Sequence, residues 1–118
     1  MERLDRPIFA AGALLSGLAV ALGAFGAHAL KGRLSPEALG WWQTGVQYQM
    51  AHGLALLAVA LAGIGRLPAA LLGGGAIAFS GTLYAMALGA PHWLGAVTPL
   101  GGLAMIAGWA LAAWRASR

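Results

Sequence analysis

The chain has 118 residues, of which 60% are hydrophobic and 8% charged, and its formal net charge is +4. Usual composition is near 25% charged residues, so this composition and a mean hydropathy of +0.78 exclude an ordinary soluble domain. The sequence contains no cysteine, basic patch or phosphate-binding loop, which excludes thiolate metal sites and predicts no nucleic-acid partner.

Four apolar stretches without Asp, Glu, Lys or Arg follow one another along the chain. Each is near or above the roughly 20 residues that a helix needs to cross a bilayer. Backbone polar groups must be satisfied internally in lipid, and the stretches lack the alternation of barrel strands, so we predict helices. The predicted fold is all-α, a four-helix transmembrane bundle with short loops in a single integral membrane domain, residues 1–118. The predicted spans are residues 7–30, 42–64, 69–88 and 94–114.

The connection between the first two spans is the only sizeable polar loop of the sequence. Within it, Ser35, Pro36 and Glu37 form the pattern of a helix N-terminus, with an N-cap, a proline in the first turn and an acid beside it. We expect a helix to start here and run into the second span. Gly65-Arg66-Leu67-Pro68 and Gly89-Ala90-Pro91-His92 predict the two remaining turns.

Basic residues flanking the spans predict the orientation, because cytoplasmic flanks are enriched in Lys and Arg. Four spans place both termini on one side. That side carries five arginines, and the other carries Lys31 and Arg33. We therefore predict that both termini lie in the cytoplasm of a bacterial plasma (inner) membrane.

Small residues recur at i,i+4 spacing in the spans, for example Gly12 with Ser16 and Ala104 with Gly108. A row that includes Ala70 and Gly74 continues along the third span. Helices in lipid associate by close van der Waals contact, which small side chains permit. We expect these faces to pack the bundle, and to offer contacts to another membrane protein or a second copy of the chain.

The second span is unusual because it is rich in polar side chains. Thr44, Tyr48 and His52 form one i,i+4 ridge, with Gln47 alongside, whereas Gln49 points away from that ridge. Polar side chains in a membrane normally face the bundle interior or a cavity. At 1.5 Å per residue, His52 lies near the bilayer midplane. We therefore expect this ridge to turn inward.

The other spans offer polar groups at similar depth, so we predict a polar cluster in the outer half of the bundle. The candidate binding residues are His28, Thr44, Gln47, Tyr48, His52, Ser80, Tyr84 and Thr98. We predict no catalytic residues, no metal site and no cofactor, because the spans hold no carboxylate or cysteine beside two histidines.

Three functions follow from these features. The first is a non-enzymatic small subunit or interaction partner, in which the polar groups only hold the helices together. The second is a binding or transport module that takes a small molecule or lipid in the polar cluster. The third is a haem or redox protein that uses His28 or His52, although the predicted depths of these two residues differ by about 10 Å.

Four short patterns occur in order along the chain. They are Gly23-Ala24-Phe25-Gly26-Ala27-His28-Ala29-Leu30, Trp42-x-Thr44-x-x-Gln47-Tyr48-Gln49-x-x-His52, Ser80-Gly81-x-x-Tyr84, and Thr98-Pro99-x-Gly101-Gly102 followed by Gly108-Trp109. These patterns resemble the small membrane proteins of domain of unknown function 423, which include bacterial inner-membrane proteins and animal transmembrane protein 256. The resemblance implies a four-helix membrane protein without an assigned activity, and it supplies no catalytic residues.

Overall fold

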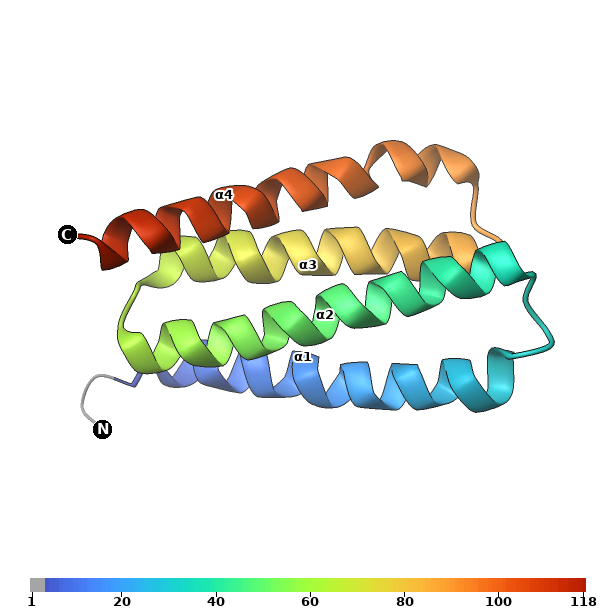
Figure 1. Ribbon diagram of the computed structural model, residues 1–118, viewed down its shortest axis with the longest axis horizontal. Helices are drawn as coiled ribbons and strands as arrows, with labels where there is room; N and C mark the ends of the chain where they lie inside the picture. The colour runs from blue at the N-terminus through green and yellow to red at the C-terminus, as the bar shows by residue number, and fades with distance from the viewer. Residues whose placement is uncertain (1–3) are drawn as a thin grey trace.

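The computed structural model describes residues 4–118, in which the chain forms four long helices (Figure 1). In chain order the elements are α1 (Arg6–Phe25), a π-helical turn η1 (Gly26–Leu30), α2 (Pro36–Ala62), α3 (Arg66–Ala87), a 3-10 turn η2 (His92–Ala96) and α4 (Thr98–Ala116). Together with their attached turns, these helices are long and apolar enough to cross a bilayer. The predicted all-α transmembrane fold is confirmed.

Local capping signals set the ends of α2. The Ser35 side chain accepts a hydrogen bond from the backbone N–H of Ala38 at 3.1 Å, and Pro36 occupies the first turn, as predicted. The helix then continues without a break, so α2 begins six residues before Trp42, where we had placed the start of the span. Gly63 ends the helix in the left-handed conformation (φ 68°), which glycine adopts without a steric penalty.

The remaining spans differ from the prediction by a few residues. α3 begins at Arg66 rather than at residue 69, because the turn after α2 lies at residues 63–65, earlier than the predicted turn at residues 65–68. The predicted span 94–114 begins in the 3-10 turn, and regular α-helix follows from Thr98 to Ala116. The last turn of the predicted span 7–30 is π-helical, with the Lys31 N–H donating to the Gly26 carbonyl.

The helices pack in chain order, each against the next, and α1 makes only slight contact with α3 (Figure 1). Both termini lie at the same end of the molecule, as an even number of spans requires. The long axis measures 47 Å. Because α2 has a neighbour on each side, it is buried over a broad face, whereas α1 and α4 keep most of their surface exposed.

Glycines permit the closest helix contacts. A Cβ added to Gly12 of α1 would lie 2.7 Å from the Gly53 carbonyl oxygen of α2. A Cβ added to Gly101 of α4 would lie 2.7 Å from the Gly75 carbonyl oxygen of α3. Such backbone approaches supply the van der Waals contact that holds helices together in lipid. Gly74, in the row of small residues predicted along the third span, makes no such contact, because a Cβ at Gly74 would meet nothing within 4 Å.

Candidate functional site

The buried face of α2 includes His52, as predicted, but not Tyr48, so it is only partly the face that we predicted. Gln49 and His52 are buried, at 4% and 5% exposure, but Tyr48 is 42% exposed. The expectation that Gln49 points away from the interior is therefore wrong. α2 packs on both α1 and α3, so the middle of its buried face runs through Gly45, Gln49 and Gly53. The signal was present in the sequence, because these three residues form an i,i+4 row in which glycines flank the polar side chain.

Gln49 joins three helices. Its Nε2 donates to the Leu15 carbonyl oxygen of α1 at 2.9 Å, and its Oε1 accepts from the Tyr84 hydroxyl of α3 at 2.7 Å. The Tyr84 ring packs against Trp42, with ring centroids 4.7 Å apart, and over Gly45. Each of these polar groups has a partner within the chain, which a polar group in an apolar surrounding requires.

His52 joins α2 to α4. Its Nδ1 lies 2.8 Å from the Tyr48 carbonyl oxygen, and its Nε2 lies 3.0 Å from the indole Nε1 of Trp109. A carbonyl oxygen only accepts and an indole N–H only donates. The ring is therefore neutral, with its proton on Nδ1. Both nitrogens are engaged, so a haem iron or metal ion at His52 would have to displace Trp109.

Hydroxyl groups form two further contacts between helices. The Ser80 hydroxyl donates to the Gly45 carbonyl oxygen at 2.7 Å, which joins α3 to α2. The hydroxyl oxygens of Thr82 and Thr98 lie 2.6 Å apart and join α3 to α4. These pairs, like the Gln49 group, bridge helices that are consecutive in the chain, whereas the His52 group joins α2 to α4.

The predicted cluster is thus divided into separate groups. Four of its residues lie at helix contacts: Ser80 and Tyr84 join α2 to α3, His52 joins α2 to α4, and Thr98 joins α3 to α4. Within residues 4–118 no three His, Asp or Glu side chains come close enough together to hold a metal ion.

Three predicted residues lie at the margin of these contacts or away from them. His28 is exposed on the π-helical turn, Thr44 is half-buried, and Gln47 is exposed beside a cavity between α1 and α2, at the end of the molecule opposite the termini. The prediction had missed Gln49, Thr82 and Trp109. Nothing local marked Trp109 as the partner of a histidine 57 residues earlier in the chain.

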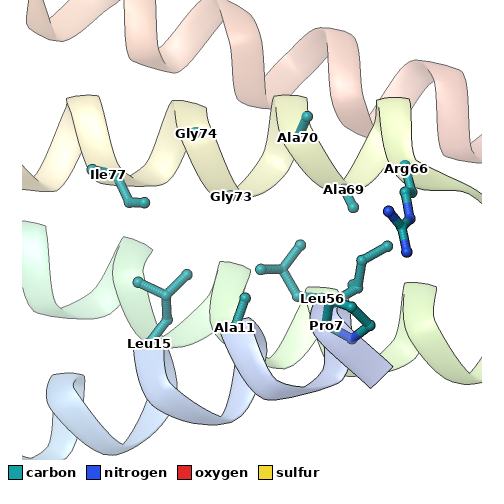
Figure 2. A pocket seen from close by; sticks show the side chains of 11 residues that line it. Pro7, Ala11, Leu15, Leu56, Arg66, Ala69, Ala70, Gly73, Gly74 and Ile77 are labelled. Atoms are coloured by element: carbon teal, nitrogen blue, oxygen red, sulfur yellow. The ribbon is translucent and has the colours of Figure 1, made fainter. Parts of the chain in front are cut away.

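An open apolar groove of about 560 Å³ runs between α1 and α3 at the end of the molecule that carries the termini. Figure 2 shows Ala11 and Leu15 of α1 on one side and Ala69 and Ile77 of α3 on the other, with Arg66 at one end. Leu56 of α2 also lines the groove.

A second cavity of about 200 Å³ extends this groove toward the opposite end of the molecule. It shares Leu15 and Ile77 with the first cavity and is also lined by Gln49, Gly81 and Tyr84. We call the two together the α1–α3 groove. Its walls are apolar apart from Arg66 at one end, Ser80, and the glutamine–tyrosine pair; Ser80 and this pair already form hydrogen bonds within the chain.

Aromatic side chains make contacts on the side of the molecule where α2 and α4 approach each other. Trp109 of α4 reaches His52, and the two rings lie 5.7 Å apart. Tyr48 of α2 packs against Phe79 of α3, with centroids 4.6 Å apart. The two sides of the molecule therefore differ: aromatic contacts link α2 to α4 on one side, and the open α1–α3 groove lies on the other.

Comparison with known proteins agrees with this architecture. The sequence profile described as "Protein of unknown function (DUF423)" matches residues 22–102. The chain belongs to this family. It is 48% identical to the UPF0382 membrane protein YwdK of Bacillus subtilis over 105 residues, covering 83% of this chain and 85% of the relative.

Two further relatives cover similar shares of the chain. The UPF0382 membrane protein SH2409 of Staphylococcus haemolyticus is 44% identical over 103 residues, covering 83% of this chain and 84% of the relative. The UPF0382 inner membrane protein YgdD of Escherichia coli K12 is also 44% identical, over 111 residues, covering 88% and 82%. No solved structure matches the chain. The DUF423 chain is thus a membrane protein of a family without an assigned activity.

Proposed function

We propose that this protein is a non-enzymatic membrane subunit whose α1–α3 groove seats a transmembrane helix of a partner chain. The observation that carries the proposal is the open groove, about 560 Å³ in its larger part and almost entirely apolar. Contiguous exposed apolar surfaces with a defined shape mark interaction sites. The partner can be another membrane protein or a second copy of this chain.

Two glycines on the α3 side of the groove support a helix as the occupant. Gly74 and Gly81 are seven residues apart, so they lie on one face of α3, and both line the groove. A Cβ at either position would meet nothing within 4 Å. Glycine in a helix interior costs about 1 kcal/mol relative to alanine, and packing within the chain does not use these two. A second helix would use them, because small residues let helix backbones approach.

The polar groups give less support to the alternatives, a ligand or transport module and a haem protein. Gln49, Tyr84 and His52 already bond within the chain, so an incoming ligand would have to replace existing hydrogen bonds. His28 is exposed on a different element. These contacts favour a structural role for the cluster, which holds the helices at the angles that leave the groove open.

We further propose that the protein lies in the bacterial inner membrane with both termini in the cytoplasm. The end of the molecule that carries the termini is the more basic one. Its described basic residues are Arg6, Arg66, Arg115 and Arg118, against Lys31 and Arg33 at the opposite end. Cytoplasmic flanks carry the excess of basic residues. The Escherichia coli relative is named an inner membrane protein, which supports the same compartment.

Site-directed photocrosslinking in living cells tests the groove. A photoreactive residue replaces Ile77, which lines the groove, or Leu14, an exposed apolar residue of α1 that does not line it. We expect a discrete protein adduct only from position 77. Gly74→Leu, which fills the groove, should reduce the adduct at least about fivefold, since overpacking a contact costs about 1–3 kcal/mol.

Gly17→Leu is the matched control, because Gly17 is also an exposed helical glycine with nothing within 4 Å of its Cβ position. It does not line the groove, so the adduct from position 77 should persist in this variant. An adduct of twice the chain mass would identify the partner as a second copy. Equal adducts from positions 77 and 14, or lipid adducts alone at position 77, would refute the proposal.

A further inference from the structure

A separate cavity of about 280 Å³ lies where the outer end of α1 meets α2. Gly23 and Ala27 line it from the first helix and its π-helical turn, and Gln43, Val46 and Gln47 line it from the second. On a helix, Gln47 and Gln49 are turned about 200° from each other. This cavity therefore faces away from the α1–α3 groove and is independent of the function proposed for it.

The two glutamine side chains in this cavity have no partner of their own. No hydrogen bond within residues 4–118 involves the amide of Gln43 or Gln47, whereas both amide atoms of the neighbouring Gln49 are bonded. The two residues are one turn apart and so point the same way. Both lie in the membrane-spanning helix Pro36–Ala62. Both side chains are exposed beside the cavity, so their amide N–H groups are free to donate to a ligand that enters from the bilayer.

The depth of the two amides indicates which lipid atoms are within reach. Trp41 and Trp93 mark the outer interface, where amphipathic rings gather, and Trp41 packs edge-on against His92 of the other outer loop. Along α2, at 1.5 Å per residue, Gln43 lies about 3 Å and Gln47 about 9 Å below Trp41. The interfacial layer is about 5–7 Å thick on each side. The amides therefore lie on either side of the boundary between the interfacial layer and the hydrocarbon core. The ester groups that join headgroups to acyl chains lie at this boundary.

We propose that this cavity binds the ester region of a phospholipid, with the glutamine N–H groups donating to its ester carbonyl oxygens. The cavity has no charged side chain in its lining, so it suits this neutral part of the lipid rather than the phosphate. Ester carbonyls only accept hydrogen bonds, and each glutamine amide offers two donors. Val46 and the ring of Trp42 provide apolar walls for the first carbons of the acyl chain.

The cavity depends on its small residues. A Cβ at Gly23 would lie 3.3 Å from Cγ1 of Val46, so the helices are close here, and Ala27 follows one turn later without filling the space. The indole N–H of Trp42 donates to the Leu22 carbonyl oxygen at 2.9 Å, which fixes the ring as a wall. Larger residues in the first helix would close the site.

Competition between ester and ether lipids tests this proposal. The purified full-length protein is equilibrated with an equal mixture of two phosphatidylglycerols that share headgroup and chain length, one diacyl and one dialkyl. The dialkyl lipid lacks the carbonyl oxygens. Native mass spectrometry then measures which lipid stays bound. One amide–carbonyl hydrogen bond predicts about a threefold preference for the ester lipid, and two predict about sevenfold.

The double variant Gln43→Leu/Gln47→Leu should lose this preference and retain the two lipids equally. Its fold is not at risk from lost contacts, because neither amide has a hydrogen-bond partner within residues 4–118. Ala27→Leu, which fills the cavity, should reduce retention of both lipids. Equal retention by the unmodified protein, or a preference that survives in the double variant, would overturn the proposal. A stable dimer without lipid preference that the double variant abolishes would also overturn it and assign the amides to a protein contact.

Discussion

The pair Gln49 and Gln47 offers a sharp test of the structure, because the same substitution two residues apart should destabilise the protein at Gln49 and leave its stability almost unchanged at Gln47. Gln49→Leu removes the bonds to the Leu15 carbonyl oxygen and the Tyr84 hydroxyl. Hydrogen bonds between membrane helices contribute about 0.6 kcal/mol each. The Tyr84 hydroxyl is then left without an acceptor, which costs about a further 1–2 kcal/mol. We expect a loss of about 2–3 kcal/mol in the free energy of unfolding.

Gln47→Leu is the control, since this side chain is exposed and has no partner within residues 4–118. Its effect should stay within about 0.5 kcal/mol. Equilibrium unfolding in mixtures of dodecylmaltoside and SDS, followed by far-ultraviolet circular dichroism, measures both.

A double-mutant cycle with Tyr84→Phe isolates the bond between the two side chains. In Gln49→Leu/Tyr84→Phe no hydroxyl is orphaned, so the double variant should be less destabilised than the sum of the single variants by at least about 0.6 kcal/mol. If Gln49→Leu is tolerated as well as Gln47→Leu, the assignment of the buried face of α2 is refuted.

Three further predictions follow from the helix contacts and the charge distribution. Gly75→Ala should destabilise the fold by about 1–3 kcal/mol, because its Cβ would lie 2.8 Å from a carbonyl oxygen of α4. Gly74→Ala should have no such cost, and SDS unfolding of both variants distinguishes the two results. Trp109→Phe removes the indole donor, so the ¹⁵N resonance of His52 Nε2 should shift in NMR spectra. An unchanged resonance would contradict the contact between these two side chains. In this cysteine-free chain, Arg33→Cys should react with an impermeant maleimide in intact cells and Ser117→Cys should not; the reverse pattern would invert the proposed orientation.

Much of the architecture followed from the sequence, because it depends on local or solvent-level properties. Charge-free apolar runs partition into a bilayer as helices whatever their neighbours are. Ser35 and Pro36 start α2 through hydrogen bonds and dihedral angles within one turn. Packing through small residues was also predictable in kind, and Gly12 against Gly53 is an instance of it.

The tertiary structure alone decided which faces of the helices meet. α2 lies between two neighbours, so the middle of its buried face falls on Gln49 rather than Tyr48. The polarity of the side chains by itself does not reveal how α2 is rotated about its axis. The bond between His52 and Trp109 joins residues 57 positions apart, for which no local pattern exists. The position of the α1–α3 groove likewise depends on which helix faces meet. Gly73 and Gly75 serve internal contacts while Gly74 stays open, because a helix turns about 100° per residue and its neighbours select the face that is used.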